Sequence, residues 1–99
     1  MKPTRSQVEA EIAALVEIKP RVRHCSAFGD NHHDAIDAQV SVLEGNMDES
    51  EIFDSYDPGD SDQGRNVLDE ALAARAWLAG EYRDYPRLVD EWKELEIKR

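Results

Sequence analysis

Apolar residues in this chain recur three and four positions apart, the spacing that gathers side chains on one face of an α-helix. The first stretch of this kind follows a capping-box pattern, Thr4 with Gln7, and is interrupted by Pro20, so a helix is predicted over residues 5–19. The apolar stripe of this helix is Val8, Ile12 and Leu15. Its opposite, solvated face is expected to carry Glu9, Glu11 and Glu17.

The next stretch, residues 20–29, contains proline, glycine and small polar residues, and is predicted to be a connection that Val22 and Phe28 hold against the core. Asp30 or Asn31 is then placed to cap a second helix, because a short polar side chain accepts hydrogen bonds from the first free N–H groups. The apolar stripe of this helix and the glycine that ends it are Ile36, Val40, Leu43 and Gly45.

A second capping-box pattern, Asp48 with Glu51, precedes an apolar pair that lies one helical turn apart, Ile52 with Tyr56. Together these features predict a short third helix. The sequence PGDSDQG comes next and is rich in turn-forming residues, so it is predicted to be a loop.

Two further helices are predicted in the last third of the chain. Residues 66–79 are rich in strong helix formers and precede Gly80, while Pro86 suits the first turn of a final helix that runs through EWKELE. The apolar positions of these helices are Leu68, Leu72 and Ala76, and then Leu88, Trp92 and Leu95. No segment alternates as a strand does and no repeat is present, so the predicted fold is all-α: a compact single-domain bundle of four or five short helices over residues 1–99.

The charge of the chain is concentrated in its middle. The formal net charge of the 99 residues is −10, and residues 30–64 contain eleven Asp or Glu and no Lys or Arg, whereas the flanking segments sum to +2 and −1. Such a segment repels a phosphate backbone and attracts Lys- and Arg-rich surfaces, so direct nucleic-acid binding is not expected. We expect this acidic segment to be locally mobile; the alternative role for its charge is only to keep the chain solvated.

The sequence favours a cytoplasmic location in a host cell. No apolar run approaches the ~20 residues that cross a bilayer, and the start MKPTRSQVEAEI lacks the apolar stretch of a secretory signal, so no membrane association is expected. The single cysteine, Cys25, excludes an internal disulfide and fits a reducing compartment.

Residues of metal-binding type gather around the start of the second predicted helix: His24, Cys25, His32, His33, Asp34 and Asp37. Their spacing matches no standard zinc motif, and adjacent histidines on a helix point about 100° apart. The paired histidines are therefore expected to be mostly solvated, and Cys25 to be a small core residue. The acidic loop also fails the EF-hand pattern, because counting from Asp60 puts Arg65 and Ala71 where glycine and glutamate are required.

Catalytic motifs are missing from the sequence, which has no nucleophile elbow and no glycine-rich phosphate loop. The prediction is a protein that is not an enzyme, with no catalytic residues, no metal and no cofactor. Binding to another macromolecule is the function class that remains.

The runs SAFGDNHHDAIDAQVSVLEG and ALAARAWLAGE, together with the size and acidity of the chain, resemble small acidic helical proteins encoded by phages and mobile elements, including anti-CRISPR inhibitors. The resemblance implies an inhibitor that occupies a basic, nucleic-acid-binding surface of a host defence complex such as a CRISPR surveillance complex. It assigns the contact to the stretch Asp48 to Asp62.

The predicted partner-binding residues are the acids of that stretch and one aromatic residue beside the apolar stripe of its helix: Asp48, Glu49, Glu51, Asp54, Asp57, Asp60, Asp62 and Trp77. The alternative hypothesis is a structural or adaptor protein that self-associates through its two carboxy-terminal helices. The sequence leaves the oligomeric state open.

Overall fold

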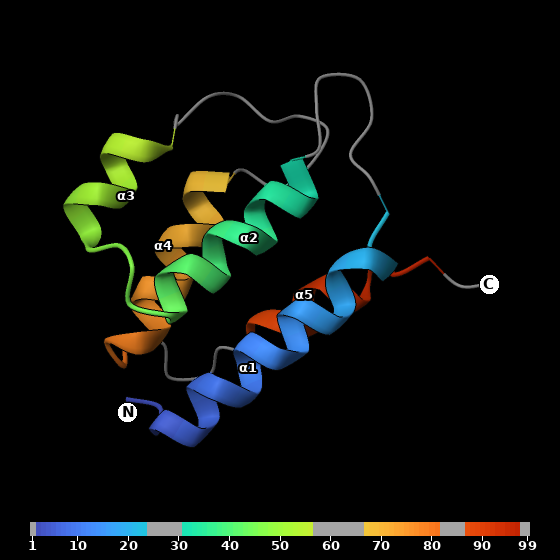
Figure 1. Cartoon of the computed structure of the whole chain (residues 1–99), viewed down its shortest axis with the longest axis horizontal. Helices are drawn as coiled ribbons and strands as arrows, with labels where there is room; N and C mark the ends of the chain where they lie inside the picture. The colour runs from blue at the N-terminus through green and yellow to red at the C-terminus, as the bar shows by residue number, and fades with distance from the viewer. Residues whose placement is uncertain (1, 24–30, 57–66, 82–86, 98–99) are drawn as a thin grey trace.

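The all-α prediction is confirmed. The computed structural model describes residues 2–23, 31–56, 67–81 and 87–97, and these contain five α-helices and one short 3-10 helix (Figure 1). The helices are α1 (Arg5–Ile18), η1 (Lys19–Arg21), α2 (Asn31–Leu43), α3 (Glu49–Ser55), α4 (Val67–Leu78) and α5 (Leu88–Lys93).

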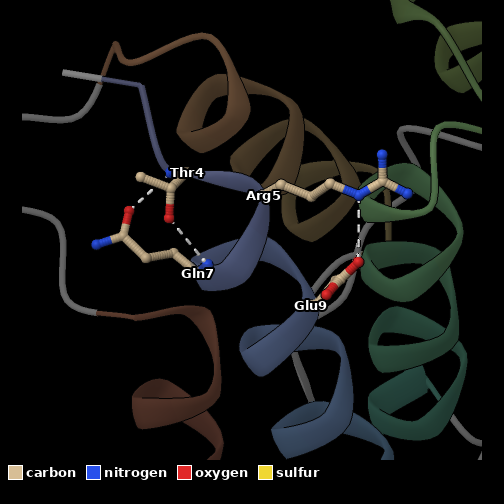
Figure 2. Close-up of polar contacts among 4 residues, drawn as sticks. All are labelled: Thr4, Arg5, Gln7 and Glu9. Carbon is tan, nitrogen blue, oxygen red and sulfur yellow. Dashed lines mark hydrogen bonds and ion pairs between the residues drawn. The ribbon is translucent and has the colours of Figure 1, made fainter.

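The first helix begins at the capping box that its sequence predicts. Thr4 Oγ1 accepts a 3.1 Å hydrogen bond from the backbone N–H of Gln7, and Gln7 Oε1 accepts one of 2.8 Å from the backbone N–H of Thr4. Figure 2 draws both contacts. One turn on, Arg5 and Glu9 form an ion pair of 3.2 Å on the exposed face. Both contacts lie within five residues of sequence, so they need no tertiary partner.

Two glycines end helices because they adopt a left-handed backbone. Gly45 has φ +83° and Gly80 has φ +75°, a region that L side chains rarely occupy. In each case the glycine N–H and the N–H after it bond back to the last turn, to Val42 and Ser41 for α2 and to Trp77 and Ala76 for α4. Both glycine stops are therefore confirmed as Schellman motifs.

The helices pack around a central pair formed by α2 and α4. Helix α1 crosses one side of this pair with α5 beside it, and α3 covers α4 on the other side (Figure 1). The radius of gyration is 12.9 Å, close to the ~13 Å of a compact 100-residue domain. The largest fully buried apolar side chains in this core are Leu15, Val22, Ile36, Val42, Ile52, Leu88 and Trp92.

The predicted last helix is too long. Helix α5 ends at Lys93 rather than running through Glu96, because the chain there turns to pair with the segment after η1. The backbone N–H of Arg23 donates to the carbonyl of Leu95 at 2.9 Å, and Val22 forms an isolated antiparallel bridge with Glu96. These long-range bonds replace the last helical turn.

Val22 is 1% exposed, so its predicted role in holding this segment to the core is confirmed. Phe28, Cys25 and Pro86, to which the sequence also assigned roles, lie outside the described residues.

The buried face of α4 differs from the predicted stripe. Leu68, Ala71 and Ala74 are buried, whereas Leu72 and Ala76 are only partly covered. The small alanines allow α4 to lie close to α2, and this close approach selects the face that is buried.

Among the described helices, none is long and apolar enough to cross a membrane.

Candidate functional site

Helix α3 carries acidic residues and no basic one. Asp48 caps it, and Glu49, Glu51 and Asp54 lie along it. Asp48 Oδ1 accepts a 2.8 Å hydrogen bond from the N–H of Glu51, and Glu51 Oε2 accepts one of 3.2 Å from the N–H of Asp48, so the second predicted capping box is confirmed. Asp48, Glu51 and Asp54 are nevertheless exposed, and their charges face solvent.

The remaining predicted acids are only partly visible. Asp57, Asp60 and Asp62 lie outside the described residues, as does the side chain of Glu49. Of the predicted acids, the structure therefore shows the side chains of Asp48, Glu51 and Asp54, all on α3 or at its cap.

Acidic residues of α2 add to this field. Asp34 and Asp37 are exposed on α2, and Lys19 neutralises part of the charge through an ion pair of 2.8 Å with Asp37. Tyr56 lies at the end of α3. Its burial, and then the negative charges of Asp37 and Asp34, raise the pKa of its hydroxyl above the ordinary value of 10.0. The carboxylates of Asp34 and Asp37 on α2 therefore act on Tyr56 at the end of α3.

An open groove of about 420 Å³ lies between α3 and α4, beside this acidic surface. The α4 side is formed by positions 69, 72, 73 and 76, which share one helical face, and the α3 side is formed by Phe53. Phe53 is 54% exposed, so more than half of its side chain is open to solvent beside the groove. The described residues that line the groove are Phe53, Asp69, Leu72, Ala73, Arg75, Ala76 and Glu81.

The rim of the groove is held by an ion pair. The Schellman motif at Gly80 turns the chain back, and Arg75 Nη1 then lies 3.0 and 3.2 Å from the two carboxylate oxygens of Glu81. Within the described part of the lining, this pairing offsets the charge of the one basic side chain. The exposed acids of α3 supply negative charge on the helix that carries Phe53.

Trp77 is partly buried and packs against the hydrophobic core. It lies outside the residues that line the groove. Its side chain therefore contributes to packing of α4, and its predicted role in partner binding stays a prediction.

The expectation that the paired histidines are mostly solvated is wrong for His32, which is 3% exposed. Its Nδ1 lies 3.1 Å from the carbonyl oxygen of Arg23, and Nε2 of His33 lies 3.0 Å from that of Val22. A carbonyl oxygen can only accept a hydrogen bond. Nδ1 of His32 and Nε2 of His33 are therefore the donors in these two contacts. The ring of His32 also meets Trp92 edge-on, with 5.8 Å between centroids.

The prediction that Glu11 lies on a solvated face is also wrong, because Glu11 is 3% exposed. Its Oε2 accepts a 3.0 Å hydrogen bond from the backbone N–H of Val89 at the start of α5, which has no cap from its own N-cap residue, Arg87. Burial raises the pKa of the Glu11 carboxyl above 4.5, while the backbone hydrogen bonds from Val89 and Leu88 oppose the rise. The Glu11 side chain therefore has a structural role, as the acceptor for a backbone N–H at the start of α5.

A buried polar chain links three helices through the core. Trp92 Nε1 donates to Gln39 Oε1 at 2.7 Å, and Gln39 Nε2 donates to Glu70 Oε2 at 3.1 Å. Gln39 is fully buried and Glu70 is 7% exposed. Sequence reasoning missed this chain, and the only signal for it was polar residues placed on otherwise apolar helix faces.

Within the part of the chain that the structure describes, no three His, Cys, Asp or Glu side chains gather in a way that could hold a metal ion. His24 and Cys25 of the predicted cluster lie outside that part. The described arrangement offers exposed acids on α3 and a groove that mixes apolar and charged side chains, which is suited to binding.

Comparisons with protein-family models, with curated proteins and with solved structures find no match to this chain.

Proposed function

We propose that the protein is a non-catalytic binding protein that docks the acidic stretch Asp48 to Asp62 on a basic surface of a partner protein. The observation that carries the proposal is α3, whose described acids face solvent with no Lys or Arg on the helix. A surface of one charge sign accelerates encounter with the opposite sign and selects against like-charged partners.

The partner class follows from the same electrostatics. Protein surfaces that bind DNA or RNA present dense Lys and Arg, and a helix with closely spaced carboxylates competes for them. The resemblance of the chain to anti-CRISPR inhibitors supports a host defence complex, such as a CRISPR surveillance complex, as the partner. On this proposal the protein inhibits by occupying the surface that would hold nucleic acid.

The test is a pull-down of the tagged protein from a bacterial lysate at about 50 and about 500 mM salt, with mass spectrometry of the bound proteins. We expect a nucleic-acid-binding complex to be captured at low salt and released at high salt. A variant with Asp54, Asp57, Asp60 and Asp62 changed to Asn is expected to lose the complex. Retention of the complex by that variant, or capture that does not depend on salt, would contradict the proposal.

A control variant removes charge elsewhere. Glu17 and Glu94 are exposed outside the acidic segment, and changing both to Gln is expected to leave capture within about twofold. Self-association through the carboxy-terminal helices is the competing hypothesis, and light scattering separates the two. A mass that rises with concentration and falls in Trp77→Ala would favour self-association.

A further inference from the structure

The groove between α3 and α4 combines features that a purely electrostatic contact does not need. Phe53 exposes 54% of its surface while its neighbour Ile52 is fully buried, so α3 directs one apolar side chain into the core and the next to the groove. Leu72 and Ala76 supply apolar surface on the opposite wall. An apolar floor with charged residues at its rim is the usual anatomy of a protein-binding site.

We infer that this groove receives an apolar side chain from a basic amphipathic helix of the partner, with the lysines or arginines of that helix placed against the acids of α3. The inference rests on the proposed function and names the partner segment that the acidic surface selects. Phe53, Leu72 and Ala76 form the apolar contact; Asp69 also lines the groove, and the exposed Asp54 follows Phe53 on α3.

Charge complementarity selects this occupant. Among the described lining residues Arg75 is the only basic one, and both carboxylate oxygens of Glu81 lie within 3.2 Å of its Nη1. An acidic or neutral helix would bring no compensation for the carboxylates of α3, whereas a basic one would pair with them as its apolar side chain leaves water. An amphipathic helix presents both features on adjacent faces.

The experiment uses the whole chain and two synthetic probes. The first is a peptide of about 14 residues, roughly four helical turns, made of leucine and lysine with the leucines on one face, and the second has the same composition scrambled. Fluorescence anisotropy of the labelled peptides gives the affinities, and amide chemical shifts of the ¹⁵N-labelled protein locate the contact. We expect the amphipathic peptide to bind about tenfold more tightly and to shift the amides of Phe53, Leu72 and Ala76.

Two groove variants and one matched control complete the test. Phe53→Ala removes the exposed wall and Ala76→Gln fills the opposite one, and each is expected to weaken the amphipathic peptide about tenfold. Val16→Ala truncates a residue that is 57% exposed on α1 and is expected to change the affinity by less than about twofold. Using two variants guards against a fold defect in either one, which circular dichroism of both reveals.

The outcomes separate the inference from the proposed function. Equal affinity for the two peptides, or unchanged affinity in Phe53→Ala and Ala76→Gln, overturns the groove inference. If the salt-dependent capture of a partner persists beside that result, the electrostatic function stands without the groove. If the peptides bind equally and the salt-dependent capture is also absent, the groove inference and the proposed function are both overturned.

Discussion

The carboxylate of Glu11, in the middle of α1, accepts a 3.0 Å hydrogen bond from the backbone N–H of Val89, 78 residues later in the chain. Helix α5 has only six residues and receives no cap from Arg87, so Glu11 supplies from another helix what a short helix needs at its start. This contact ties α5, which carries the buried Trp92, to the first helix of the bundle.

Glu11→Ala is expected to destabilise the protein by about 1–3 kcal/mol, because it leaves a buried N–H without an acceptor. Urea denaturation followed by circular dichroism measures the change. Glu17→Ala, on the exposed side of α1, is the control and is expected to stay within about 0.5 kcal/mol of the parent. Equal stability of the two variants would show that the Glu11 cap contributes nothing.

Titration of Glu11 is expected to make the free energy of unfolding depend on pH. Burial raises the pKa of its carboxyl in the folded state above 4.5, so the folded protein holds this proton more tightly than the unfolded chain does. The stability contributed by the protonated form is complete below pH 4.5 and is lost as the pH rises through the raised pKa. Relative to Glu11→Gln, which keeps a neutral acceptor, the parent should therefore lose stability over that window.

Denaturant titrations of the parent and of Glu11→Gln at several pH values between about 4 and 8 give this difference directly. Other carboxylates titrate in both proteins and cancel in the comparison. A difference that is flat with pH, or that grows in favour of the parent, would contradict the assignment.

Trp92→Phe is expected to cost about 1–3 kcal/mol, because it keeps an aromatic ring but removes the donor to Gln39 Oε1 in the core. The same change at the partly buried Trp77 is expected to cost less. Thermal unfolding of both variants tests the comparison, and a smaller loss at Trp92 than at Trp77 would remove the buried polar chain as a source of stability.

Gly45→Ala is expected to destabilise by about 1–2 kcal/mol. A Cβ at this position would meet nothing within 4 Å, so the cost comes from φ +83° alone. Ser50→Ala, at an exposed position of α3, serves as the control for a small local change. An unchanged melting temperature in Gly45→Ala would mean that the end of α2 rearranges.

The candidate site was predictable only in part. The charge of α3 and its capping box could be predicted from Asp48 and Glu51, because capping depends on residues three positions apart. The groove could not, because the exposure of Phe53 depends on how α3 lies against α4. The position of Trp77 beside the apolar stripe of its helix predicts a role in partner binding, yet Trp77 packs on the core while Phe53 is exposed.

The sequence by itself determined where the described helices form and how several of them begin and end. Thr4, Asp48, Gly45 and Gly80 act on backbone groups within a few residues of themselves, so their local pattern is sufficient.

Only the tertiary structure decided which polar residues are buried and where α5 stops. Glu11 finds its partner 78 residues away, and Trp92 finds Gln39 53 residues away. The carbonyl of Leu95 accepts a hydrogen bond from the backbone N–H of Arg23 instead of continuing the helix. A polar side chain or N–H group can be buried when a distant partner satisfies it, and helical periodicity carries no information about that partner.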